Sequence, residues 1–111
     1  MFAFEIPGMR FSLPAGADVE RFRFVSVDAS SNGIPATADT QIVGVSMNKA
    51  ESGKVLEVAD GIVMVEAGAA ITAGAAVYSG AEGKAAATGT VVAGVAITAA
   101  SAAGDIITVK M

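Results

Sequence analysis

The side chains that could do chemistry in this sequence are few and scattered. It contains no His and no Cys, which excludes Ser-His and Cys-His nucleophile systems and the usual zinc ligand sets. Acid–base chemistry would fall to carboxylates, lysines or Tyr78. The 11 acidic residues stand singly in predicted turns and on strand faces, and no local spacing brings two carboxyl groups together. We therefore predict no catalytic residue, no metal site and no cofactor, and a protein that is not an enzyme.

One loop places oxygen-bearing side chains at alternate positions. Asp28, Ser30 and Asn32 precede Gly33, much as calcium ligands open a helix–loop–helix site. That pattern also requires a Glu at its twelfth position and flanking helices. The twelfth residue counted from Asp28 is Asp39, the next acid in the sequence, and strands rather than helices are predicted on both sides. An Asx-type turn explains the loop better. The Gly-rich tract of residues 67–89 likewise lacks the phosphate-loop and dinucleotide fingerprints.

The strands that would have to position any site are clearest in residues 62–111. This stretch contains three apolar strand candidates, 62–66, 91–98 and 105–111, separated by turns of small residues. Residues 91–98 alternate two sets of side chains, which is the period of a strand. Residues 105–111 resume β-branched character. The short connection predicts that the last two strands form a hairpin.

Further extended segments are predicted elsewhere in the chain. Repeated glycines in residues 67–89 argue against a helix, since each would cost a helix interior about 1 kcal/mol relative to Ala. Tight turns are predicted at Pro7-Gly8, Asn32-Gly33 and Asp60-Gly61. The remaining extended segments are expected at 1–6, 11–19, 20–28, 41–48, 54–59, 75–78 and 84–87. We predict an all-β (mainly β) fold, a small barrel or sandwich of about eight or nine short strands.

Residues 15–59 and 67–111 resemble one another, which indicates a diverged tandem duplication. Much of the identity involves Gly, Ala and Val, which are abundant throughout. The aligned residues include Val27 with Val77, Gly33 with Gly83, Gly44 with Gly94 and Gly53 with Gly104. The repeat predicts two hairpin modules closing one shared core, within a single β domain of residues 12–111.

Composition excludes several classes of protein. A chain of 111 residues is one domain on length, and its net charge of −4 without a basic cluster argues against a nucleic-acid partner. No apolar run is long enough to span a membrane, and residues 1–10 lack the features of a signal peptide. The absence of Cys fits a reducing cytoplasm. Since only 16% of residues are charged, much of the surface is expected either to consist of Ala, Gly, Ser and Thr or to be covered by another chain.

The N-terminal residues 1–11 allow two interpretations. Phe2, Phe4 and Ile6 share one side of an extended segment, and Phe11 follows shortly after. The segment could form a strand on the protein's own sheet, or an arm that docks its aromatic side chains on a neighbour. The concentration of phenylalanines at this end motivates the arm, whose predicted contact residues are Phe2, Phe4, Ile6, Met9 and Phe11.

A carrier domain is the alternative in another class. The rhythm of residues 63–80 is similar to that of a lipoyl or biotinyl domain, in which a flattened β barrel presents a modified lysine on a tight hairpin. The candidate is Lys84, in the sequence Ala81-Glu82-Gly83-Lys84, but it lacks the flanking methionines of such motifs. A free-standing β-barrel binding module is a further alternative.

Three features together resemble the small capsid cement, or head decoration, proteins of tailed bacteriophages. They are the Gly-punctuated turn and strand of residues 67–78, the Gly-Val-Ala of 94–96, and the closing Ala-Gly-Asp-Xaa-Xaa-Xaa-Val of 103–109. The resemblance covers most of the chain and is best from Ile62 onward.

This resemblance implies a non-enzymatic virion protein with a small β-rich body, made in the host bacterial cytoplasm. Such proteins assemble as homotrimers, or in some relatives dimers, on the outer surface of the capsid. They bind the major capsid protein where capsomers meet, after the shell expands, and brace it against the pressure of packaged DNA. The resemblance also implies that an N-terminal arm often completes the contact with the capsid.

Overall fold

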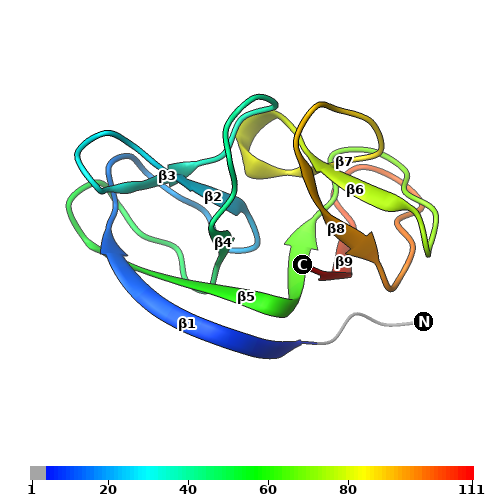
Figure 1. Ribbon diagram of the computed structural model, residues 1–111, viewed down its shortest axis with the longest axis horizontal. Helices are drawn as coiled ribbons and strands as arrows, with labels where there is room; N and C mark the ends of the chain where they lie inside the picture. Colours follow the sequence, from blue (N-terminus) through cyan, green and yellow to red (C-terminus); the bar gives the residue numbers. More distant parts are fainter. Residues whose placement is uncertain (1–4) are drawn as a thin grey trace.

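The computed structural model describes residues 5–111 and confirms the all-β prediction (Figure 1). The described chain forms nine strands and one 3-10 turn, η1. Their bounds are β1 (Ile6–Pro14), β2 (Phe24–Val27), β3 (Gly33–Pro35), β4 (Gly44–Ser46), β5 (Val55–Glu66), β6 (Ala76–Ser79), η1 (Ala81–Gly83), β7 (Ala85–Ala86), β8 (Val92–Ala96) and β9 (Ile106–Lys110). No helix in these residues is long and apolar enough to cross a membrane.

One curled antiparallel sheet joins all the strands. Its order is β3-β2-β4-β5-β9-β8-β6-β7, and β1 pairs with β5 outside this path. The twelve-residue β5 therefore has three partners, β1, β4 and β9. In Figure 1 it runs from the lobe that contains β2, β3 and β4 to the lobe that contains β6, β7, β8 and β9.

The side chains of β5 serve two different cores. Leu56 and Val58 are fully buried in the smaller cluster, which also holds Val19 and Val25. After Val58 the buried positions change face, and Ala59, Val63 and Val65 enter the larger cluster. Because side chains alternate along a strand, this change of face lets a single strand supply both lobes.

Two turns predicted from sequence lie inside strands instead, which corrects the expected boundaries. Asp60-Gly61 continues β5, and Pro7-Gly8 lies within β1. At this point the register shifts between Pro7 and Arg10, so that two residues of β1 face Asp60. Such a bulge absorbs residues that would otherwise end a strand, and β1 and β5 stay paired through it.

The two stretches proposed as a duplication make matching contacts. We call residues 15–59 the N half and residues 67–111 the C half. Four backbone pairings of the N half have a counterpart in the C half. Phe24–Val45 corresponds to Ala76–Val95, and Val45–Ala59 corresponds to Val95–Lys110. Val27–Gly33 corresponds to Ser79–Ala85, and Val19–Ala50 corresponds to Ile71–Ala100. This correspondence supports the proposal of a tandem duplication, with two changes to the alignment. Val25 rather than Val27 is the counterpart of Val77, and Ser31 rather than Gly33 is the counterpart of Gly83.

Candidate interaction surface

The predicted contact residues that the structure describes lie on β1. Their exposed fractions are 62% for Ile6, 66% for Met9 and 38% for Phe11. Phe2 and Phe4 lie outside the described residues. From Ile6 onward the segment is paired with β5, with Ile6 opposite Ile62 and Phe11 opposite Val58. Residues 6–11 thus form a strand of the protein's own sheet that still presents large apolar side chains at the surface.

The bulge in β1 fixes how Met9 is presented. The Met9 N–H donates to Asp60 Oδ1 at 3.1 Å, which holds the bulged residue against β5. Gly61 has a φ of +99°, and a Cβ there would lie 2.5 Å from the Gly8 nitrogen. Only glycine combines a positive φ with so close an approach of the neighbouring backbone without strain. The Asp-Gly pair therefore allows the two backbones to approach where Met9 turns outward.

A second apolar surface lies on the C half, and sequence analysis did not single it out. A row of directly paired residues crosses five strands, from Ala76 through Val95, Lys110 and Ile62 to Ile6. Directly paired residues point to the same face of a sheet. We call this face the outer face, defined by Ile6, Ile62, Ala76, Val92, Val95, Ile97, Ile106 and Lys110. Val92, Val95, Ile97 and Ile106 are exposed on it.

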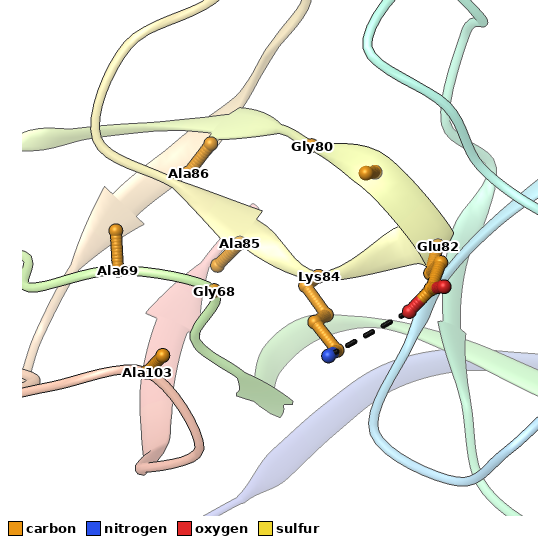
Figure 2. A pocket seen from close by; sticks show the side chains of 9 residues that line it. Gly68, Ala69, Gly80, Glu82, Lys84, Ala85, Ala86 and Ala103 are labelled. Atoms are coloured by element: carbon orange, nitrogen blue, oxygen red, sulfur yellow. Dashed lines mark ion pairs between the residues drawn. The ribbon is translucent and has the colours of Figure 1, made fainter.

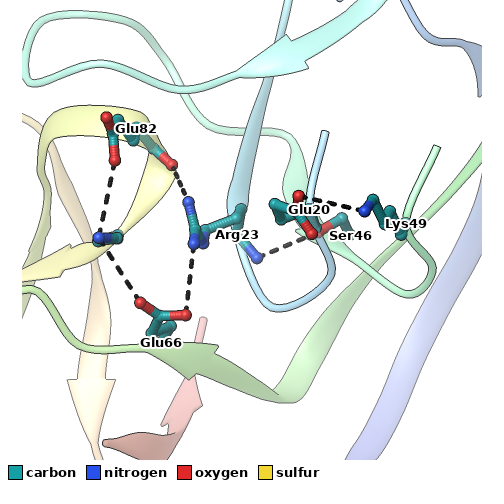
Figure 3. A network of polar contacts seen from close by, with 7 residues as sticks. Glu20, Arg23, Ser46, Lys49, Glu66 and Glu82 are labelled. Atoms are coloured by element: carbon teal, nitrogen blue, oxygen red, sulfur yellow. Dashed lines mark hydrogen bonds and ion pairs between the residues drawn. The ribbon is translucent and has the colours of Figure 1, made fainter. Parts of the chain in front are cut away.

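A polar network joins the two halves (Figure 3). Arg23 Nη2 lies 3.3 Å from Glu66 Oε1, and Arg23 Nη1 donates to the Glu82 carbonyl at 3.2 Å. Lys84 Nζ lies 3.6 Å from Glu66 Oε2 and 3.6 Å from Glu82 Oε2. The Arg23 N–H donates to Ser46 Oγ at 3.1 Å. These contacts tie β2 to the end of β5 and to η1, so the network serves to hold the lobes together.

The contacts of Lys84 favour a structural role over the carrier alternative. Its amine lies between two carboxylates, and its side chain is about one-third exposed. A carrier lysine has to be free to enter an enzyme's active site, whereas this one is held at the junction of the halves.

An open hollow of about 380 Å³ lies beside Lys84 (Figure 2). Its lining is mostly Gly and Ala, and its two charged side chains, Glu82 and Lys84, pair with each other. Such walls provide neither a nucleophile nor an aromatic face to hold a small molecule. Among the described residues no group of His, Cys, Asp or Glu is arranged to hold a metal ion.

The loop of residues 28–32 is an Asx-type turn, as the sequence predicts. Asp28 Oδ1 accepts the N–H groups of Ser30 and Asn32, both at 2.9 Å. These bonds stabilise the carboxylate and lower the pKa of Asp28, the Asn32 backbone bond contributing most. The carboxylate of Asp28 therefore closes the β2–β3 connection.

Comparison with known proteins gives one family and one fold. A family model described as phage cement protein matches residues 6–111. Among solved structures, the crystal structure of the head fiber gp8.5 N base of bacteriophage phi29 is similar, with a TM-score of 0.79 at 22% identity. The match covers 93% of this chain and 92% of that one. No curated protein matches the sequence.

Proposed function

The chain belongs to the phage cement protein family, and on this premise we propose that it binds the outside of the expanded phage head and stabilises the shell against the pressure of packaged DNA. The match over residues 6–111 carries the proposal, because it spans nearly the whole chain. The protein is then a structural component of the virion rather than an enzyme. Its partners are the major capsid protein and further copies of itself, assembled as a homotrimer.

The surface of the protein suits this work. Only 16% of its residues are charged, and large apolar side chains stand exposed on β1 and on the C half. Contacts that are weak one by one add up when they repeat around a symmetric shell. The net charge of −4 also disfavours competing attachment to the packaged DNA.

We assign the capsid contact to the N-terminal residues Phe2, Phe4, Ile6, Met9 and Phe11. Met9 and Phe11 present apolar side chains from a strand that is already ordered on β5, so binding would not have to order this segment. Within the described residues β1 pairs with β5 alone. Its second edge is therefore suited to accept a strand of the shell protein.

Substitutions on β1 test this assignment. The double variant Met9→Glu, Phe11→Glu keeps the backbone of β1 but replaces two exposed apolar side chains with charges. We expect it to fold and to lose most of its co-sedimentation with emptied, expanded heads. Deleting residues 1–4 tests Phe2 and Phe4 separately and leaves the β1–β5 pairing intact. The deletion is expected to weaken binding without changing the circular dichroism spectrum.

The matched control is Val55→Glu, because Val55 is 68% exposed at the start of β5, where it pairs with Pro14, three residues beyond the last predicted contact residue, Phe11. This variant should bind heads as the wild type does. Normal decoration by the double variant and by the deletion would show that the contact lies elsewhere. Failure of the wild-type protein to bind expanded heads would overturn the proposed function itself.

A further inference from the structure

A row of paired residues that is buried in the N half corresponds to a row that is exposed in the C half. In the N half, the paired residues Phe24, Val45 and Ala59 are fully buried. They belong to the same cluster as Val77, Ile107 and Val109 of the C half. The corresponding residues of the C half are Ala76, Val95 and Lys110, and all three are exposed. The outer face is thus the counterpart of a surface that the chain itself buries in its N half.

The turn of the C half that contacts the buried residue Phe24 also has a counterpart in the N half. Gly83, the last residue of η1, lies so close to β2 that a Cβ there would be 2.6 Å from the Phe24 carbonyl oxygen. Gly83 and Ser31 hold the same place in their turns, with φ angles of +72° and +65°. The enclosing bonds also match, from Gly80 N–H to the Lys84 carbonyl and from Asp28 N–H to the Asn32 carbonyl. Ser31 is exposed at the surface.

We propose that the outer face of one chain receives the Ser31 turn of a second copy, repeating between chains the contact that Gly83 and Phe24 make within one. The expected neighbours across this interface are Ser31 and Ala76, the counterparts of Gly83 and Phe24. The two surfaces also carry opposite charges, Lys110 on the outer face and Asp28 in the turn. This inference rests on the proposed function, because it names the surface through which the cement protein trimerises.

The contact is heterologous, since two different surfaces of the chain meet. Contacts of this kind either close into a ring or continue as an open filament. A closed ring of three accounts for a trimer without requiring a second kind of interface. Because each subunit uses one outer face and one Ser31 turn, the part of every outer face around Ala76 and Val95 is occupied in the ring. Ile6, at the other end of the row, stays available for the capsid contact.

The first test measures the mass of the free protein in solution, without heads, by light scattering after gel filtration. The wild type should run as a trimer of the 10.9 kDa chain, and Val95→Glu as a monomer with an unchanged circular dichroism spectrum. Val95 is 45% exposed, so the charge does not have to enter a core. Val55→Glu, again the matched control, should remain a trimer. A monomeric wild type, or a trimeric Val95→Glu variant, would overturn the proposal.

Disulfide trapping tests which surfaces meet. The chain has no Cys, so Ser31→Cys and Ala76→Cys can be made singly, mixed, allowed to exchange subunits and oxidised. We expect the mixture to give disulfide-linked dimers, which neither variant gives alone. Ser52→Cys mixed with Ala76→Cys is the control, because Ser52 is also exposed but lies outside the turn. A trimer without the Ser31–Ala76 link would overturn the head-to-tail contact.

Head binding separates this inference from the proposed function. If Val95→Glu stays trimeric and nevertheless loses co-sedimentation with heads, the outer face contacts the shell, and the self-interface is overturned while the cement function stands. If the wild type forms the predicted trimer but no variant or wild-type protein binds heads, the interface stands and the cement function falls.

Discussion

The guanidinium of Arg23 and the carboxylate of Glu66 lie 3.3 Å apart across the junction of the two lobes. The same carboxylate faces Lys84 through its second oxygen at 3.6 Å. One acid thus contacts a base on each side of the junction. Both Arg23 and Glu66 are largely shielded from solvent, with side chains 15% and 25% exposed, so the pair is screened less than one on the surface.

Replacing Glu66 by Gln is expected to lower the free energy of unfolding by about 1–3 kcal/mol, because it removes the charged partner of a partly buried arginine. The control is Glu57→Gln. Glu57 pairs with Arg10 at 2.8 Å, but both side chains are about half exposed, and such a pair contributes less than about 1 kcal/mol. Urea denaturation of both variants measures the difference. Equal losses would show that the junction does not depend on Glu66.

Replacing Gly61 by Ala is expected to destabilise the protein more than replacing Gly53 by Ala. Both glycines have positive φ, so each substitution carries a backbone cost of about 1–2 kcal/mol. A Cβ at Gly53 meets nothing within 4 Å, whereas one at Gly61 would also press on the Gly8 backbone. The additional cost should appear as a lower Tm. Equal melting temperatures would mean that β1 can move away from β5 freely.

Truncating Phe24 to Ala is expected to cost about 3–5 kcal/mol, as for other large buried aromatic side chains. Phe24 is fully buried in the cluster shared by the two halves. Val27→Ala, on the same strand but with Val27 exposed, should change stability by less than about 1 kcal/mol. Thermal or urea unfolding compares the two. A small effect at Phe24 would mean that the lobes do not depend on a common core.

Asp28 makes stability fall in acid. Its pKa is lowered in the folded protein by the Asn32 and Ser30 N–H groups, so the folded state favours the ionised form. The contribution is complete above the unfolded pKa of Asp, near pH 4, and is lost as the pH falls through the lower folded value. Asp28→Asn retains a side-chain oxygen for the turn but cannot titrate. The loss of stability between about pH 5 and pH 2 should be smaller in this variant, and an identical loss would contradict the assignment.

The sequence predicts the fold class of this protein better than its strand boundaries. Alternation in residues 91–98 and 105–111 correctly indicates the β8–β9 pairing. Asp60-Gly61 and Pro7-Gly8 have the local chemistry of turns, but the two pairs meet across β1 and β5, and the glycines are used for close approach instead. Local propensity cannot distinguish these uses, because the deciding contact is far away in sequence.

The outer face shows a second limit of the sequence. Val45 and Val95 each follow a glycine in similar strands, yet Val45 is 1% exposed and Val95 is 45% exposed. The sequences around Val45 and Val95 are similar because both residues occupy the equivalent position in equivalent strand pairs. Their exposure differs because the C half lies against only one of them, and that arrangement is a property of the assembled halves.

The sharing of β5 has a mechanical consequence. β5 is covalently continuous from one lobe to the other and pairs antiparallel with β1, β4 and β9. A pulling force along β5, such as internal pressure on the shell would produce, would load several inter-strand hydrogen bonds in shear at once and would not break them one by one. β5 would therefore transmit such a force from one lobe to the other while its hydrogen bonds share the load.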